Sequence, residues 1–220
     1  MLNVLAGPQV HRVETPASPF AVRIALKRVF DVVVTALVLL VALPLLLILM
    51  AAICLESPGN PIYVQERLGV HGKRFRMLKL RSMVLDAEQR QAELEHLNEA
   101  LPPLFKVRHD PRVTHVGHIL RITSLDELPQ LINVLKGDMS IVGPRPRRPH
   151  EFATDDPLVA RRLSVKPGLA GLWQVSGRAT LDFDEALALD LQYIDNWSFW
   201  MDLKLIVRTL WVVLTFQGAY

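Results

Sequence analysis

The chain is poor in cysteine, with Cys54 as the single one among 220 residues. One cysteine excludes an intrachain disulfide, and nothing in the composition indicates an oxidising compartment. Cys54 lies in the most apolar stretch of the chain, which favours a buried thiol with a structural role. Internal repeats and low-complexity tracts are also lacking, so neither a repeat architecture nor a disordered chain is expected.

The net charge is small, at +3, but it is unevenly distributed. One cluster of basic residues contains no acid, and its members are Arg67, Lys73, Arg74, Arg76, Lys79 and Arg81. Such a cluster suits phosphate-bearing partners, whether lipid headgroups, nucleotides or nucleic acid. Charge alone supports equally well the alternative that these basic residues form a solvent-exposed face with no ligand.

Hydrophobic residues make up 50% of the chain, which allows either one sizeable core or a modest core plus a membrane segment. The mean hydropathy of +0.25 favours the second. Residues 1–22 read as an irregular lead-in. Residues 23–56 are predicted to be a membrane-embedded helix, with an apolar run interrupted only by Asp31 and Pro44. A run of about 27 residues can cross a bilayer core of about 30 Å. Residues 57–220 then form the remaining domain.

The flanks of the apolar run bear on how it sits in a membrane. Basic residues lie on both sides of it, and by the positive-inside tendency both ends prefer the cytoplasm. Pro44 removes a helix hydrogen bond and favours a bend. These features favour a re-entrant helix that enters and leaves on one face. A kinked spanning helix and a buried helix of a soluble protein are the alternatives, and a cleaved signal peptide is not expected.

Local patterns predict the elements of the remaining domain. Residues 61–64 are expected to form a short strand, 73–81 a strand with a basic face, and 86–101 an exposed helix. His115 and His118 have the spacing of a metal pair, but no third ligand is evident nearby, which favours solvated histidines. A helix is also expected over 180–193.

Two adjacent carboxylates, Asp126 and Glu127, are the strongest catalytic candidates. Ser124 and Glu127 match a capping box, in which the acids would only complement a helix dipole. Pro129 weakens that interpretation, since proline is comfortable only in the first turn, so the helix is expected to begin near Leu128 and to end at Gly137. Two neighbouring acids could hold Mg²⁺, or one could act as a nucleophile while the other handles protons.

Two loops downstream suit anionic ligands. Residues 137–149 are expected to form a loop that holds three arginines, including Arg145, on a backbone stiffened by prolines, which suits bidentate phosphate contacts. Residues 166–178 combine glycines with an aromatic, an amide and an arginine, and could approach a nucleotide closely. The candidates in this second loop are Gly171, Gln174, Gly177 and Arg178.

The C-terminal segment alternates tryptophans with leucines and a few charged residues. Asp202, Lys204 and Arg208 argue against a full membrane span. A helix lying at the membrane interface and an ordinary core helix are equally good interpretations.

Together these motifs resemble the bacterial sugar transferases, the small monotopic phosphoglycosyl transferases of polyprenyl-phosphate pathways. The similarity covers residues 27–215. Its motifs are KRVFD (27–31), QERLG (65–69), KLRSM (79–83), DPRVT (110–114), residues 121–130 with the acid pair, NVLKGDMS (133–140), GPRP (143–146), and residues 167–178. Some members carry serine before the helix-bending proline, where this chain has Leu43. Longer members also carry upstream spans and a further domain, which these 220 residues do not contain.

The resemblance implies a helix-rich α+β fold with an N-terminal re-entrant membrane helix, a small cytoplasmic catalytic domain and interfacial amphipathic helices. It implies transfer of a sugar-1-phosphate from a nucleotide diphosphate sugar, expected to be a UDP-sugar, to polyprenyl (undecaprenyl) phosphate. This would be the first membrane step of bacterial glycoconjugate or exopolysaccharide synthesis, on the cytoplasmic face of the inner membrane. Membrane lipids are expected partners and nucleic acid is not. A homo-oligomer is left open.

The match at the acid pair implies a ping-pong reaction in which Asp126 attacks the β-phosphate and nucleoside monophosphate leaves. Mg²⁺ is the expected cofactor, with Asp126 among its ligands, and Glu127 positions groups or shuttles a proton. The residues expected to bind substrate phosphate are Arg121, Arg145, Arg112 and Lys79. Two rival hypotheses are a direct glycosyltransferase that releases nucleoside diphosphate and a membrane-surface adaptor that binds anionic lipid.

Overall fold

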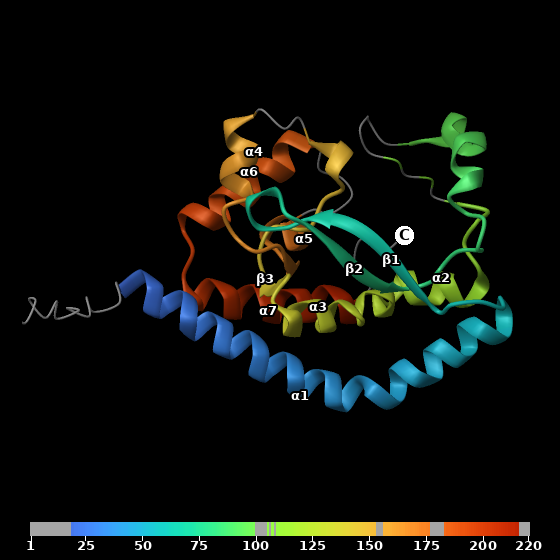
Figure 1. Cartoon of the computed structure of the whole chain (residues 1–220), viewed down its shortest axis with the longest axis horizontal. Coiled ribbons are helices and arrows are strands. Elements are labelled where there is room, and N and C mark those ends of the chain that lie inside the picture. The colour runs from blue at the N-terminus through green and yellow to red at the C-terminus, as the bar shows by residue number, and fades with distance from the viewer. Residues whose placement is uncertain are drawn as a thin grey trace, which may run out of the picture.

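The computed structural model describes residues 19–99, 105, 107, 109–152, 156–176 and 183–215. It has a helix-rich α+β fold in which one long helix runs beneath a body of short helices and two small sheets (Figure 1). The predicted helix-rich α+β class is confirmed.

Helix α1 spans Pro19–Glu56 and contains Pro44. Its sequence has no glycine, and Pro19 fits the first helical position, where a missing N–H costs nothing. Pro44 crowds the preceding turn of the helix. We call the part of α1 before Pro44 its first arm and the part after Pro44 its second arm, and Figure 1 shows α1 bent so that both arms rise toward the body. The lead-in prediction is wrong for residues 19–22, which are helical, and residues 1–18 lie outside the described part of the chain.

The outer surface of α1 is apolar and exposed. Leu55 is 86% exposed, Val41 80% and Leu40 70%, and the same surface includes Leu26, Val29, Leu37, Leu47 and Ile48. Within the described residues one helical stretch, Ala21–Glu56, is long and apolar enough to cross a membrane. A soluble monomer rarely leaves so large a contiguous apolar surface in water.

The inner face of the first arm carries polar residues that fix α1 to the body. Lys27 Nζ donates to Asp202 Oδ2 at 2.5 Å and to the Val142 carbonyl at 3.1 Å. Asp31 is only 3% exposed and accepts a hydrogen bond from Ser140 Oγ at 2.8 Å. Lys27 and Asp31, two charged residues of this mostly apolar helix, therefore face protein.

Arg28 binds the C-terminal end of helix α3 (Gln130–Lys136). Its guanidinium donates to the carbonyls of Val134 and Leu135 at 2.6 and 2.8 Å, in the last turn of the helix, where carbonyls lack the usual intrahelical partner. The Val134 carbonyl also accepts a hydrogen bond from the Gly137 N–H at 3.0 Å. Gly137 follows with φ 92°, a left-handed conformation that glycine adopts without steric cost. The predicted end of this helix is confirmed.

The second arm of α1 packs on helix α2 (His115–Ile122) and the neighbouring hairpin. Ile53 lies in one buried cluster with Leu80 and Leu120. Beyond it, Glu56 accepts hydrogen bonds from the first two backbone N–H groups of α2, at 2.7 and 2.9 Å. Both arms of the bent helix thus contact the same body.

Strands β1 (Ile62–Leu68) and β2 (Arg74–Leu80) form an antiparallel hairpin joined by the 3-10 helix η1 (Val70–Gly72). The predicted strands are confirmed, but the expected basic face of the second is wrong. Side chains alternate along a strand, so exposed Arg74 and Arg76 lie on one face and Lys79 on the other. The register pairs Tyr63 with Lys79, and these two share their face with Gln65 and Arg67.

Residues 86–101 were expected to form an exposed helix, and the structure has a 3-10 helix, η2 (Gln89–Leu97), within them. No residue of η2 is buried, so nothing packs it into a regular α-helix. Residue 100 and residues 101–104 lie outside the described part of the chain.

Strands β3 (Ser140–Val142) and β4 (Gly168–Ala170) form a parallel pair within segments expected to be loops. Three residues are too few for a visible alternation, and a parallel pair forms only through tertiary contact. The pair holds the backbone of the 143–149 loop beside the 166–176 segment.

Four helices and a turn complete the body: the 3-10 helix η4 (Pro149–Glu151), α4 (Pro157–Arg162), α5 (Leu172–Ser176), α6 (Phe183–Asp195) and α7 (Phe199–Leu214). Helix α6 confirms the helix predicted over residues 180–193, of which residues 180–182 lie outside the described part of the chain. In α7, Leu205 and Val212 are buried while Trp200 and Trp211 are 73% and 63% exposed. One face of α7 therefore packs in the core, as expected for a core helix, and another apolar face is exposed, as expected for a helix at a membrane interface.

Candidate active site

The acid pair, Asp126 and Glu127, lies in the 3-10 helix η3 (Leu125–Glu127), which connects α2 to α3. Within the described structure the Ser124 side chain makes no capping hydrogen bond, and its φ of 57° is left-handed, so the capping box is wrong. Helix α3 begins at Gln130 with Pro129 as its cap residue, close to the predicted start. The proline therefore leaves both carboxylates outside the regular helix.

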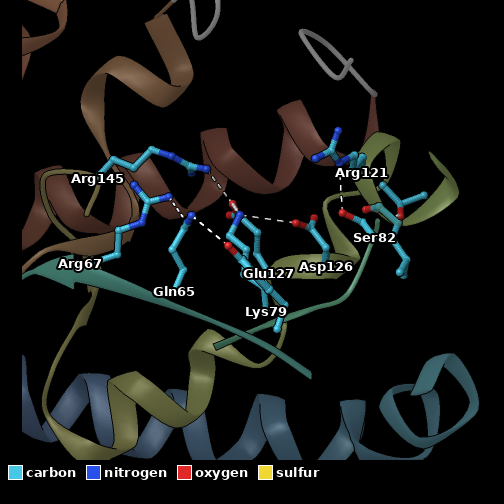
Figure 2. Close-up of polar contacts among 11 residues, drawn as sticks. Gln65, Arg67, Lys79, Ser82, Arg121, Asp126, Glu127 and Arg145 are labelled. Carbon is cyan, nitrogen blue, oxygen red and sulfur yellow. Dashed lines mark hydrogen bonds and ion pairs between the residues drawn. The ribbon is translucent and has the colours of Figure 1, made fainter. Parts of the chain in front are cut away.

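Lys79 joins the acid pair from the hairpin (Figure 2). Its Nζ lies 3.0 Å from Glu127 Oε1 and 3.4 Å from Asp126 Oδ2. The three side chains are 13–20% exposed, so they are screened from solvent but still reachable. Strand alternation explains the arrangement, because the face of β2 that carries Lys79 is turned toward η3.

Arg145 approaches the acid pair from the loop after β3. Its Nη2 donates to Glu127 Oε1 at 2.8 Å. The Arg145 carbonyl accepts a hydrogen bond of 2.5 Å from Arg162, whose Nε donates to Asp190 at 2.7 Å. Arg162 and Asp190 are 3% and 1% exposed, so a buried ion pair supports the loop that presents Arg145. No local pattern in the sequence links these two residues to the site.

Arg121 lies on the opposite side of the acid pair, beside Asp126 (Figure 2). It is carried by the last turn of α2. Its Nε donates to Ser82 Oγ at 3.1 Å, and the charge of Asp126 raises its pKa against the larger lowering effect of burial. Arg121, Lys79 and Arg145 thus surround the acids from three separate elements.

The two carboxyls differ in their electrostatic environment. Burial raises the pKa of Asp126, and the Glu127 charge adds to this effect, while Lys79 opposes it. Burial would also raise the pKa of Glu127, but the charges and hydrogen bonds of Arg145 and Lys79 outweigh it and hold that pKa well below its usual range. Asp126 is therefore the more basic carboxylate and Glu127 the more firmly held one.

Further arginines extend the site beyond Glu127. Arg67, on the same face of the hairpin as Lys79, is hydrogen-bonded to Gln65, and its Nη1 lies 3.8 Å from Glu151. Arg148 Nε lies 3.8 Å from the same carboxylate oxygen. Sequence reasoning placed Arg67 in a basic cluster but not in the site; its strand register with Lys79 is the signal that could have found it.

Arg112 was expected to bind phosphate, and the structure places it elsewhere. Its guanidinium is 5% exposed and forms a 2.6 Å ion pair with Asp110 and a 2.9 Å hydrogen bond to the Ala87 carbonyl. It therefore braces the segment that leads into α2 and does not reach the acid pair.

The glycine-rich loop is only partly described. Gly171 precedes α5, and a Cβ there would lie 2.2 Å from Gln174 Oε1 and 2.6 Å from the Gly143 carbonyl, so only glycine fits. Gln174 is 7% exposed and donates to the Leu169 carbonyl at 2.8 Å. These two residues hold the loop against the β3–β4 pair. Gly177 and Arg178 lie outside the described residues.

The histidine pair has no further ligand beside it among the described residues. His115 and His118 are exposed on α2, and among the described residues no group of three or more His, Cys, Asp or Glu side chains could hold a metal ion. Of the acid pair, Asp126 is the carboxylate with fewer cation contacts.

Known proteins resemble this chain over most of its length. The Salmonella typhimurium undecaprenyl-phosphate galactose phosphotransferase is 44% identical over 89% of this chain and 42% of its own. The Caulobacter vibrioides UDP-glucose:undecaprenyl-phosphate glucose-1-phosphate transferase is 45% identical over 88% of this chain and 72% of its own. The Streptococcus agalactiae galactosyl transferase CpsE is 50% identical over 74% of this chain and 37% of its own.

This chain therefore spans less than half the length of two of these relatives. The profile of the family described as bacterial sugar transferase matches residues 22–216. That match includes nearly all of α1, the acid pair and the cations described around it. The chain belongs to the bacterial sugar transferase family.

Proposed function

We propose that this protein transfers a sugar-1-phosphate from a UDP-sugar to undecaprenyl phosphate and releases UMP. The observation that carries the proposal is an acid pair of unequal basicity held among cations from three elements. The names of the Salmonella and Caulobacter relatives supply the acceptor and the reaction class, and the Caulobacter name supplies the nucleotide. The reaction would be the first membrane step of glycoconjugate or exopolysaccharide synthesis.

Asp126 acts as the nucleophile in this proposal. One of its oxygens lies 3.4 Å from Lys79, a long contact that leaves the carboxylate able to reach a substrate. Its raised pKa makes the ionised carboxylate of Asp126 a better nucleophile than that of Glu127. Asp126 attacks the β-phosphorus, UMP leaves, and the lipid phosphate then displaces the aspartate from the acyl phosphate.

Glu127 acts as a positioning residue and not as a proton shuttle. Its lowered pKa makes it a poor base, and its two ion pairs hold Lys79 and Arg145 beside the reacting phosphate. Lys79, Arg121 and Arg145 stabilise the charge that develops on the phosphoryl oxygens.

Mg²⁺ fits this site as an ion that arrives with the substrate. Magnesium in phosphoryl-transfer sites takes one or two carboxylates and completes its shell with substrate phosphate and water. Asp126 would supply the protein oxygen, since Glu127 is occupied by cations. When bound, the ion would neutralise charge on the diphosphate.

A membrane location accounts for the exposed apolar surfaces. Both arms of α1 contact the same body, so we propose a re-entrant helix with the body on one face, the cytoplasmic face by its flanking basic residues. The exposed tryptophans of α7, Trp200 and Trp211, would lie at the membrane interface.

A panel of nucleotide sugars tests the proposal. The purified full chain is incubated in detergent with each donor, undecaprenyl phosphate and Mg²⁺, and the products are identified. Nucleoside monophosphate and a lipid diphosphate sugar are expected. Release of nucleoside diphosphate would indicate direct glycosyl transfer, and membrane binding without turnover of any donor would indicate an adaptor.

A further inference from the structure

Three guanidinium groups gather on the Glu127 side of the acid pair. We name Arg67, Arg145 and Arg148 the arginine cluster. Their side chains are 14%, 35% and 33% exposed, so each is partly sheltered but none is sealed from solutes. Figure 2 shows Arg67 and Arg145 on this side, with Arg121 beyond Asp126 on the other.

Among the described residues, the three arginines of the cluster have fewer carboxylate partners than positive charges. Their ion-pair partners there are Glu127, which is shared with Lys79, and Glu151, which lies 3.8 Å from two arginines at once. The buried Nε atoms of Arg67 and Arg148 have no hydrogen-bond acceptor within the described structure. Buried donors without acceptors indicate a ligand that supplies them.

Electrostatics supports the same conclusion. Burial lowers the pKa of Arg67 to about 10, and the charges of Arg145 and Arg148 add to the lowering, against the opposite effect of Glu151. The three cations therefore repel one another in a partly desolvated place. A phosphate dianion would relieve that repulsion and accept hydrogen bonds from each guanidinium.

The chemistry of two successive displacements limits where such a phosphate can lie. In phosphoryl transfer the attacking and leaving oxygens are roughly in line with the phosphorus. When the Asp126–phosphorus bond forms, the bond to the leaving phosphate breaks on the opposite side, and UMP departs with the electron pair. The second attack must expel Asp126 as a carboxylate, so the lipid phosphate must enter from the side that UMP has left.

We propose that the arginine cluster is a single anion subsite used twice, first by the phosphate of the departing UMP and then by the phosphate of the polyprenyl acceptor. The inference rests on the proposed function and deepens it. Arg121 and Lys79, beside Asp126, remain with the sugar phosphate that stays bound to the enzyme. Occupation by UMP and by the lipid is then mutually exclusive.

Inhibition kinetics of the full chain in detergent test the shared subsite. UMP is varied against undecaprenyl phosphate, and the inhibition constant for UMP and the KM for the lipid are measured in Arg148→Gln and Arg67→Lys. Arg148→Gln removes a charge from a part-exposed side chain, whereas Arg67→Lys keeps the charge of a more buried one. Arg74→Gln, an exposed arginine of the same hairpin paired with Glu66, is the control.

The shared subsite predicts that UMP competes with the lipid and that both constants rise together, about tenfold in Arg148→Gln, with no change in Arg74→Gln. Non-competitive inhibition, or a change in only one of the two constants, would overturn it and indicate separate subsites. A wild-type enzyme that releases UDP instead of UMP contradicts the proposed function itself, which separates the two failures.

Discussion

Charged residues lie in partly buried positions both on the inner face of α1 and in the acid-pair site. The two places differ in whether each charge has a partner of opposite charge or a hydrogen bond. Around α1, Lys27 is paired with Asp202, and Asp31 accepts hydrogen bonds from β3. Around the acid pair, five cations face three carboxylates: Lys79, Arg121, Arg145, Arg67 and Arg148 against Asp126, Glu127 and Glu151.

The difference separates charges that stabilise the fold from charges that, under the proposed function, bind a phosphate ligand. A buried charge is tolerated when it is paired and hydrogen-bonded, as at α1. An excess of cations is unfavourable in the free protein and becomes favourable when phosphate binds. Substitutions around α1 should therefore reduce stability, while substitutions around the acid pair should reduce activity.

The largest effect is expected for Asp126→Asn. The amide cannot attack phosphorus, so UMP release should fall by about 10⁴-fold. The long Lys79 contact contributes little to the fold, so the melting temperature should stay close to that of the wild type. Rates of UMP release and thermal unfolding measure the two effects, and full release by the variant would rule out Asp126 as the nucleophile.

Asp202→Ala should destabilise the protein by about 3–5 kcal/mol, because it leaves the largely buried ammonium of Lys27 without its carboxylate partner. Asp202 is 2% exposed and also accepts hydrogen bonds from Tyr193 and Trp197, at 2.8 and 3.1 Å. Denaturant unfolding in detergent measures the loss. Asp195→Ala removes an exposed partner of Arg161 and is the control, with about 0–1 kcal/mol expected; equal losses would contradict the comparison.

Glu127→Gln should lower kcat/KM by about 10²-fold, less than Asp126→Asn, since it releases Lys79 and Arg145 without removing the nucleophile. Steady-state kinetics with the preferred donor measure the effect. Glu66→Gln, which removes an exposed partner of Arg74, serves as the matched control. A loss as complete as that of Asp126→Asn would instead favour a direct role for Glu127 in the chemistry.

The pH dependence of UMP release should report Asp126. Because its pKa is raised and the reaction needs the carboxylate, activity should be lost as pH falls through a value above the ordinary one for aspartate. The Lys79 charge lowers this pKa, so Lys79→Met should move the acid limb to higher pH, while Lys73→Met at an exposed position should not. An acid limb that stays in place in Lys79→Met would show that another group controls it.

The smallest effect is expected for Thr114→Ala, at the junction of α1 and α2. Thr114 Oγ1 accepts a hydrogen bond from the Gly117 N–H at 3.0 Å, and losing such a cap costs about 1 kcal/mol. Denaturant unfolding should show this loss with kcat/KM unchanged. A fall in activity would mean that this junction also positions Arg121.

Much of this fold follows from local patterns. The apolar run predicts α1, the patterns at residues 61–64 and 73–81 predict the two strands of the hairpin, and Pro129 and Gly137 delimit α3. Local patterns failed where the deciding contact is distant: β3 and β4 are short strands that exist only as a pair, and the basic residues of β2 are divided between two faces. Arg112 was misassigned because its nearest acid, Asp110, takes up its charge.

The sequence by itself indicated that two adjacent carboxylates lie outside a helix, because Pro129 disfavours a helix start several residues before it, and that a long apolar helix contains a proline, Pro44, that favours a bend. Only the tertiary structure decided which cations meet those carboxylates. Lys79, Arg121 and Arg145 come from a strand, a helix and a loop, and a charge acts over distances that chain folding alone sets. That arrangement shifts the pKa values of Asp126 and Glu127 in opposite directions, although the two are neighbours in the sequence.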